Sequence, residues 1–317
     1  MMWRAARSPD GERVEPEASR LGEVGPMQTV VEDVTVATAD ATNIVSSPDV
    51  DRDGAPYLIY QPAVDLGTGR LLGFEALVRW FDGSDEPILP EDLIPWAEAN
   101  GHMTALNEWV LAEACAQAAR WPSRLQLAVN CSVFQLLRRE AAAAAASALA
   151  GSGLDPDRLT VEITESSVAN EKAVAHLAAM AHLGIQIAVD DVVTDGSVVE
   201  NRHDSTINTL KIDGSLIADL STRGGSNRAI IETIITLCHS LHLCTVAEAV
   251  ETAEQVAILR ELGADVAQGY FFSPPLSATA AHALAAMDPL PFFNLTASSH
   301  PISLRVLDTG PSRPLGG

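Results

Sequence analysis

The sequence has few lysine and aromatic residues, and it lacks long apolar stretches. Lysine occurs twice in 317 residues, and 20 basic residues stand against 42 acidic ones, for a formal net charge of −22. Such a charge repels duplex nucleic acid and anionic membranes, because both normally bind basic surfaces. No apolar run approaches the roughly 18 residues of a membrane-spanning helix. We therefore expect neither a nucleic-acid partner nor a membrane segment.

Cysteine is also scarce, and its pattern excludes a disulfide-rich secreted domain. The four cysteines show no CxxC spacing. The N-terminus, MMWRAARSPDGERVEPEASR, has no apolar core of a signal peptide. These features favour a reducing cytoplasm.

The two ends of the chain differ in composition from the part between them. Residues 1–54 are rich in acidic residues, proline, serine and threonine, which predicts a mostly disordered tail that could recruit an unknown protein partner. Residues 289–317 are loop-like. With 47% hydrophobic residues in the whole chain, we expect one folded domain over residues 55–288.

Eight short β-branched or apolar runs predict strands, and helical patterns separate most of them. The runs begin at Tyr57, Phe74, Leu125, Leu159, Ile185, Thr209, Cys244 and Val266. Eight strands alternating with helices over about 230 residues predict an α/β protein with a (β/α)8 (TIM) barrel. The first two strands are joined by DLGTGRLLG, which suits a hairpin and is too short for a helical crossover. The barrel should therefore begin with an antiparallel pair.

Two helical segments have clear apolar faces. TALNEWVLAEACAQAARW places apolar residues at helical spacing, with Leu106 and Val110 among them. NRAIIETIITLCHSL does the same, and we expect its buried face to comprise Ile230, Ile234, Ile235, Cys238 and Leu241.

Polar side chains interrupt or follow seven of the predicted strands. They are Glu75, Asn130, Glu162, Asp190 with Asp191, Lys211, Glu248 and Gln268. A single carboxylate of this kind could belong to a structural salt bridge, because a bare charge in a core is costly. Barrel strands, however, deliver their carboxyl ends to a common mouth. We therefore expect these side chains to form one ring.

The ring would hold five carboxylates and one lysine. Two carboxylates about 5 Å apart, as in Asp190-Asp191, repel each other by roughly 3 kcal/mol at an effective dielectric constant of 20. Protonation or a divalent cation can relieve this repulsion. All-oxygen ligands suit Mg²⁺ or Mn²⁺ better than Zn²⁺, and five acids can hold two ions, the arrangement that cleaves phosphate esters. A metal-free structural network is the alternative.

Several motifs in order make residues 56–287 resemble the EAL-domain cyclic di-GMP phosphodiesterases. The motifs are YQPAVDLGTGRLLGFEALVRW with Glu75-Ala76-Leu77, PEDLIPWAEANG, VNCS, VEITES, IAVDD, LKID, AEAVET and QGYFFSPPL. The resemblance implies a modified TIM barrel with an antiparallel first strand. It also implies hydrolysis of cyclic di-GMP to linear pGpG with Mg²⁺ or Mn²⁺, and a homodimer.

The resemblance also implies a role for each matching residue. A first metal would be held by Glu75, Asn130, Glu162 and Asp190, and a second by Asp190, Asp191 and Glu248. Lys211 would position the attacking hydroxide, and Glu248 would be the general base. Substrate contacts would come from Gln61, Leu77 and Arg79, the last pairing with a phosphate. Gln268 would lie near the second metal, and Glu165 would brace the loop after the Asp190-Asp191 pair.

That loop departs from the family pattern. The family usually reads FGTGYSS after the two aspartates, whereas this chain reads VVTDGSV over residues 192–198. Ala249 likewise stands where the family has glycine. Because the altered loop could impair turnover, second-metal binding and dimerisation, a cyclic di-GMP receptor or interaction module is the alternative to an enzyme. A barrel enzyme that abstracts a proton next to a carboxylate is a third class, but the acidic tail is too small and polar to supply the capping domain that such enzymes need.

Two other features suggest chemistry less strongly. CHSLHLC, with Cys238, His239, His242 and Cys244, invites a zinc site but is better explained as an amphipathic helix running into a strand. Cys131 follows Asn130 and should point away from it, so we expect no nucleophilic role.

Overall fold

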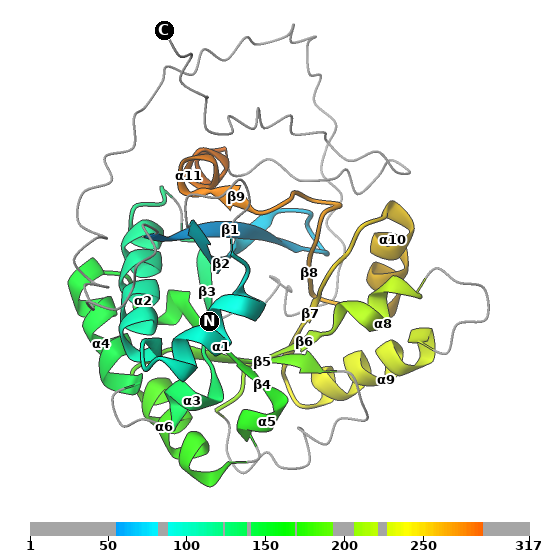
Figure 1. Ribbon diagram of the computed structural model, residues 1–317. Helices are drawn as coiled ribbons and strands as arrows, with labels where there is room; N and C mark the ends of the chain where they lie inside the picture. The colour runs from blue at the N-terminus through cyan, green and yellow to red at the C-terminus, as the bar shows by residue number, and fades with distance from the viewer. Residues whose placement is uncertain are drawn as a thin grey trace, which may run out of the picture.

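Figure 1 shows the computed structural model of the chain, which describes residues 55–81, 88–122, 124–137, 141–168, 170–192, 206–220 and 227–287. The predicted tails, 1–54 and 289–317, lie outside these residues, as do residues 193–205 with most of the altered loop.

Eight strands close into a barrel. They are β1 (Ala55–Asp65), β2 (Leu71–Phe81), β3 (Gln126–Asn130), β4 (Leu159–Thr164), β5 (Gln186–Val192), β6 (Thr209–Ile212), β7 (Cys244–Ala247) and β8 (Val266–Gln268). Neighbours from β2 to β8 pair in parallel, and β1 closes the ring by pairing antiparallel with both β2 and β8. A two-residue strand, β9 (Leu276–Ser277), also pairs with β1. The predicted barrel and its antiparallel first strand are confirmed.

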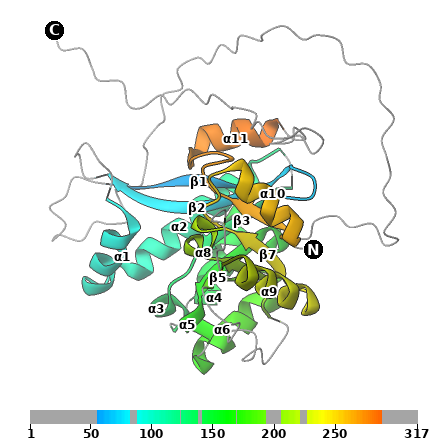
Figure 2. The same ribbon diagram turned by 90° about the vertical axis from the view of Figure 1, so that its right-hand side faces the viewer.

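Helices surround the barrel on its outside, as Figures 1 and 2 show. They are α1 (Pro90–Ala99), α2 (Met103–Ala119), α3 (Val133–Leu136), α4 (Ala141–Ser152), α5 (Glu165–Val168), α6 (Glu171–His182), α8 (Gly214–Ala218), α9 (Asn227–Ser240), α10 (Ala253–Leu262) and α11 (Ala278–Ala286). None of the helices in the described residues is long and apolar enough to cross a membrane.

One detail of α9 corrects the expected apolar face. Its buried residues are Ile231, Ile234, Ile235 and Cys238, whereas Ile230 exposes 37% of its surface. At about 100° per residue, Ile230 lies roughly a quarter turn from the centre of this stripe. The predicted helix is confirmed, but the assignment of Ile230 to its buried face is wrong.

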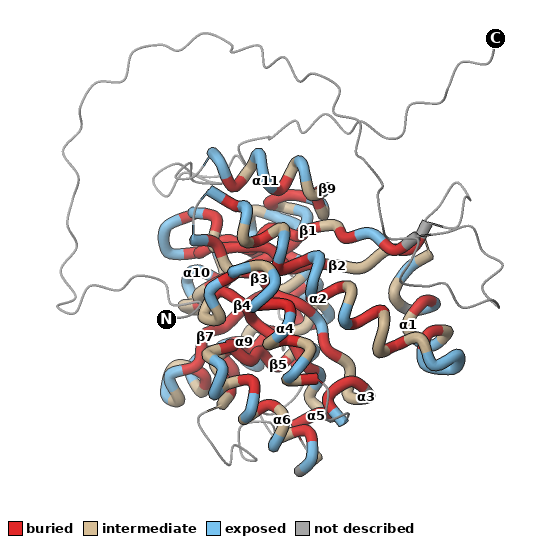
Figure 3. Tube along the Cα trace, turned by 90° about the vertical axis from the view of Figure 1, so that its left-hand side faces the viewer, coloured by how far each residue is buried: buried red, intermediate tan, exposed pale blue. Residues whose placement is uncertain are grey.

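The barrel core places the polar residues at one end. The tube in Figure 3 shows buried residues along the strands and the inner helix faces. Ala128 and Val246 belong to a small buried apolar cluster that also contains Ala63, Cys244 and Val266. Because side chains alternate along a strand, Asn130 and Glu248, two residues farther on, face the same way as Ala128 and Val246. The apolar cluster thus forms a floor beneath the polar end.

Candidate active site

Lys211 stands at the centre of the polar end of the barrel. It is 1% exposed, and its Nζ contacts four carboxylates from four other strands or strand ends. The partners are Glu75 at 3.4 Å, Glu162 at 2.8 Å, Asp190 at 3.0 Å and Glu248 at 2.8 Å. One ammonium group therefore faces four acids.

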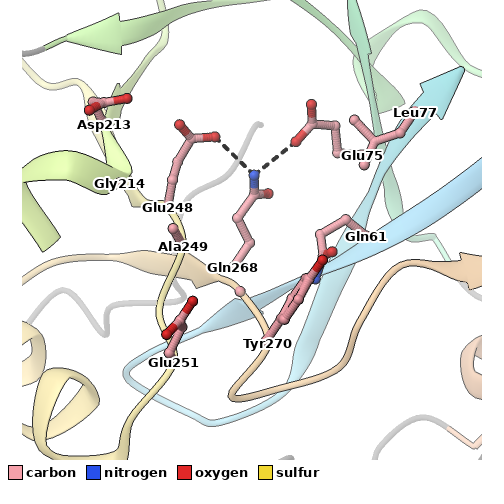
Figure 4. A pocket seen from close by; sticks show the side chains of 11 residues that line it. Gln61, Glu75, Leu77, Asp213, Gly214, Glu248, Ala249, Glu251, Gln268 and Tyr270 are labelled. Atoms are coloured by element: carbon pink, nitrogen blue, oxygen red, sulfur yellow. Dashed lines mark hydrogen bonds between the residues drawn. The ribbon is translucent and has the colours of Figure 1, made fainter. Parts of the chain in front are cut away.

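Two amide side chains tie the carboxylates together. Gln268 Nε2 donates to Glu75 Oε2 at 2.8 Å and to Glu248 Oε1 at 3.0 Å, as the dashed lines in Figure 4 show. Asn130 Nδ2 donates to Glu75 Oε1 at 2.7 Å. Each carboxylate oxygen of Glu75 thus accepts a hydrogen bond from an amide. Residues from seven strands or their ends converge here, as the strand-end pattern predicts.

Burial and the charges within this cluster shift the pKa values of its carboxyl groups. Burial acts to raise the pKa of Glu75, but Lys211 and the two amide hydrogen bonds outweigh it, so that this pKa lies below its usual value. Burial and the nearby Glu75 raise the pKa of Glu162 well above normal, although Lys211 opposes them. Burial likewise raises the pKa of Glu248 to about 7 against the attraction of Lys211. The lysine alone therefore does not keep all the acids ionised near neutrality.

The donor set fits divalent cations. Ligand oxygens of Asp190, Asp191 and Glu248 all lie within 4.8 Å of one another. Desolvation and then the charge of Asp190 raise the pKa of Asp191. Carboxylate and amide oxygens are hard ligands of the kind that Mg²⁺ and Mn²⁺ bind. An added positive charge would relieve the same repulsion that raises these pKa values.

A cavity of about 520 Å³ opens beside the cluster, within the size range of small-molecule sites. Its wall includes Glu75, Glu248 and Gln268 of the cluster. Two of the predicted substrate contacts, Gln61 and Leu77, line it as well. The charged cluster and a ligand-sized space therefore share one wall, which Figure 4 shows from close by.

Two predicted residues belong neither to the charged cluster nor to this wall. Arg79 follows Leu77 by two positions on β2, and its Nη1 donates to the carbonyl oxygen of Val78 at 2.8 Å rather than lining the described cavity. Glu165 is the first residue of α5, directly after β4, and is partly buried. The loop that it would brace lies outside the described residues.

Sequence reasoning missed three side chains of the cavity wall, namely Asp213, Glu251 and Tyr270. Each follows a strand-end residue of the cluster by two or three positions. The signal was present, because a strand that ends at the barrel mouth also brings the following residues there. The sequence motifs single out Lys211, Glu248 and Gln268 instead.

The cysteines show no sign of chemistry. Burial raises the pKa of the Cys131 and Cys238 thiols to about 12, and it raises the pKa of the Cys244 thiol well above its usual value. A thiolate, which is the form that binds zinc or attacks a substrate, is therefore disfavoured. In the described part of the chain, the group able to hold a metal is the acidic one around Asp190.

Comparison with known proteins identifies the family. A family model described as the EAL domain matches residues 51–275. The chain belongs to the EAL domain family. The oxygen sensor protein DosP of Escherichia coli is 36% identical over 227 residues, which cover 70% of this chain and 28% of DosP. The cyclic di-GMP phosphodiesterase NbdA of Pseudomonas aeruginosa is 35% identical over 231 residues, or 71% of this chain and 29% of NbdA. The EAL match thus spans less than a third of either relative.

Solved structures share the fold. The PaMucR phosphodiesterase in complex with c-di-GMP is 30% identical, with a TM-score of 0.65, and the match covers 71% of this chain and 93% of that one. The EAL domain of Mycobacterium smegmatis DcpA is 29% identical, with a TM-score of 0.61, covering 74% and 97%. Klebsiella pneumoniae BlrP1, in a complex with calcium and cyclic di-GMP, is 27% identical, with a TM-score of 0.62, covering 70% and 56%.

Proposed function

We propose that this EAL domain hydrolyses cyclic di-GMP to linear pGpG in a reaction that requires Mg²⁺ or Mn²⁺. The observation that carries the proposal is the convergence of four carboxylates on Lys211 at the edge of a ligand-sized cavity. An apolar barrel would not gather these charges for stability alone, because each loses its hydration on burial. Family membership and a relative named as a cyclic di-GMP phosphodiesterase support the same reaction.

Different residues of the cluster would bind the cations, orient the water and accept its proton. Glu75, Asn130, Glu162 and Asp190 would hold one cation, and Asp190, Asp191 and Glu248 a second. When bound, such cations polarise a phosphodiester and lower the pKa of water. Lys211, in contact with Glu248 and Asp190, would orient the attacking water. With its pKa of about 7, Glu248 can accept a proton near neutral pH.

The wall of the cavity would hold the substrate. Leu77 supplies apolar surface, and Gln61 directs its amide into the wall itself, donating Nε2 to the carbonyl oxygen of Ser273 at 2.6 Å. This leaves the amide oxygen of Gln61 as its acceptor toward a ligand. Arg79, farther along β2, would reach the second phosphate of the dinucleotide through its guanidinium. Binding at the remote phosphate would help to fix the scissile one.

A receptor without turnover is the second candidate, and the sequence after Asp191 favours it. Two glycines of the family loop are replaced there, one by a β-branched residue that resists positive φ. Such a protein would bind cyclic di-GMP without cleaving it. The cluster around Lys211 is common to both candidates.

Incubation of the full chain with cyclic di-GMP and Mg²⁺ or Mn²⁺, followed by chromatography for pGpG, separates the two. The enzyme predicts pGpG formation that chelation abolishes. Glu75→Ala should abolish turnover and weaken metal-dependent binding, whereas Glu108→Ala, on the exposed face of α2, should leave both unchanged. Binding of cyclic di-GMP with no pGpG formed in Mg²⁺ or in Mn²⁺ would support the receptor and reject the enzyme. Failure to bind would reject both candidates.

A further inference from the structure

The strands β1 and β2 continue past the rest of the barrel as a two-stranded ribbon, which Figure 2 shows. In the described part of the chain, β3 pairs with β2 as far as Ala76, and β9 pairs with β1 from Ile59. The pairing of β1 with β2 extends farther, to Ala55 opposite Phe81. The ribbon therefore forms a rim beside the cavity of the proposed active site.

One face of this ribbon continues the cavity wall. Three successive pairs on this face are Gln61–Glu75, Ile59–Leu77 and Tyr57–Arg79. Side chains two positions apart on a strand share a face, and so do residues directly opposite each other in an antiparallel pair. Because Glu75 and Leu77 line the cavity, Tyr57 and Arg79 lie on the same face, one pair farther out.

A second apolar side chain borders Arg79 from the other side. Trp80 exchanges backbone hydrogen bonds with Ile88, at 3.2 and 2.8 Å, in an antiparallel bridge. The same register places Leu89 beside Arg79. Trp80 is buried, whereas Leu89 exposes 41% of its surface and Tyr57 exposes 38%. The half-buried Arg79 therefore has an exposed apolar side chain on each side of it.

Apolar neighbours change what a guanidinium group can do. The group has five N–H donors, and one bond, from Nη1 to the Val78 carbonyl oxygen at 2.8 Å, uses one of them. A pair of opposite charges attracts more strongly, and salt screens it less, when apolar groups keep water away from it. The ring of Tyr57 can also attract the cation through its π face. Two exposed apolar side chains beside one arginine therefore suit the binding of an anion.

We propose that Tyr57 and Leu89 flank Arg79 in order to shield its pairing with the second phosphate of the dinucleotide. This inference rests on the proposed function, which assigns that phosphate to Arg79. The two flanks are positioning residues, because they act through Arg79 and not on the reacting atoms. They would set the affinity for the ligand, and the hydroxyl group of Tyr57 would be dispensable.

Tyr57→Thr and Leu89→Thr remove the flanks, and threonine suits both a strand and the N-cap position of α1 that Leu89 occupies. Loss of the cation–π contact predicts a rise of about 3- to 30-fold in KM and Kd for cyclic di-GMP in Tyr57→Thr. Loss of apolar surface predicts about 2- to 10-fold in Leu89→Thr. The kcat should change less than threefold. Tyr57→Phe and the control Leu183→Thr, at an exposed apolar side chain after α6, should stay within twofold of the wild type.

A double-mutant cycle with Arg79→Met separates shielding from a structural role. The Kd is measured by equilibrium dialysis in Ca²⁺, with chromatography to verify that the ligand stays intact. Arg79→Met should raise Kd by about 10- to 100-fold, the range for a hydrogen-bonded charge. Once Arg79 is absent, Tyr57→Thr should change Kd by less than twofold. With Arg79 present, Tyr57→Thr should also make Kd rise more steeply with salt, because the exposed pair is screened more.

Binding within twofold of the wild type by Tyr57→Thr would overturn the proposal and leave the proposed hydrolysis standing. So would an equal loss in Tyr57→Thr with and without Arg79, because the ring would then act elsewhere. Wild-type binding by Arg79→Met would overturn it too, since the shielded pair would not exist. If the wild type binds without turnover, hydrolysis fails but Kd still decides the role of the flanks. If the wild type does not bind, both proposals fail.

Discussion

At the scale of single residues, Lys211 is both stabilised and constrained by its surroundings. Burial alone would lower its pKa, but Glu162, Glu75, Glu248 and Asp190 outweigh burial and raise the pKa well above its usual value. The ammonium group therefore stays charged. Removing it would leave four acids facing one another in a largely buried site, where an uncompensated charge costs far more than at the surface.

Lys211→Met tests this dependence. Without metal, we expect the variant to lose about 3–5 kcal/mol of unfolding free energy relative to the wild type, because its carboxylates lack a counter-charge. Mn²⁺ should restore more stability to the variant than it adds to the wild type, since a divalent ion supplies the missing charge. Turnover should be lost while cyclic di-GMP binding is largely kept. Denaturant unfolding with EDTA or Mn²⁺, together with Kd and pGpG measurements, checks each statement.

The matched control is Lys172→Met, which changes the other lysine of the chain, an exposed residue in the first turn of α6. It should leave stability and turnover unchanged. Equal loss of binding and turnover in Lys211→Met would contradict the positioning role of Lys211.

How far the site could be predicted from the sequence depends on the kind of residue. Glu162 and Lys211 stand out because each is a charge inside an apolar strand, which is unusual unless the charges meet. Tyr270 and Glu251 do not stand out, because an aromatic or acidic residue in a loop is common on any surface. Only the closed barrel reveals that they share a cavity wall with Gln268. No sequence pattern predicts that Arg79 lies away from the described cavity wall either.

At the scale of elements, the turn after β7 stores strain. Ala249 has a φ of 48°, a left-handed conformation that costs an alanine roughly 1 kcal/mol relative to glycine. Its methyl group faces Gly214 at the start of α8, where an added Cβ would approach the Ala249 Cβ to 2.6 Å. Both residues line the cavity. The left-handed conformation of Ala249 and the absence of a side chain at Gly214 are thus coupled.

A double-mutant cycle measures this coupling. Ala249→Gly should stabilise the protein by up to about 1 kcal/mol, because glycine adopts positive φ freely. Gly214→Ala should destabilise it by about 1–3 kcal/mol through the clash with Ala249. The double variant should recover most of that loss, which gives a coupling energy on the order of 1 kcal/mol or more in urea unfolding.

Gly151→Ala is the control for this cycle, because Gly151 lies in α4 and no other side chain or distant backbone atom comes within 4 Å of where its added methyl group would lie. It should be neutral or stabilising, since alanine is the better helix former. If the changes at Gly214 and Ala249 have strictly additive effects on the free energy of unfolding, the two residues are not coupled through this contact.

Elements were easier to anticipate than contacts between them. The short DLGTGRLLG connection already excluded a crossover helix, so the antiparallel β1–β2 pair followed from chain length alone. The buried face of α9 was misassigned because the pairs Ile230/Ile234 and Ile231/Ile235 both have the spacing of one helical turn. Packing against the barrel buries the face that contains Ile231. The contact between Gly214 and Ala249 joins residues 35 positions apart, and no local pattern encodes it.

At the scale of the whole molecule, the acid cluster couples folding to pH and metal. An ordinary glutamate titrates near pH 4.5, whereas burial raises the pKa of Glu248 in the folded protein to about 7. Between these values the folded state holds a proton that the unfolded state releases. Stability therefore falls as pH rises through this window. Glu162, whose pKa is also raised, acts in the same direction. Glu75, with its lowered pKa, affects stability below this window, and Lys211 above it.

Without metal, we therefore expect the melting temperature to fall between pH 5 and pH 8, and Glu248→Gln to reduce the slope because its amide does not titrate. Mn²⁺ competes with protons for the same oxygens, so that its stabilisation of the wild type should grow over this range. Self-repulsion in a chain of net charge −22 also rises with pH, but it is common to both proteins and cancels in their difference. Identical slopes for wild type and Glu248→Gln in EDTA would show that Glu248 does not contribute to this pH dependence. A Mn²⁺ shift independent of pH would place the ion on oxygens that are already ionised at pH 5, and so away from Glu248.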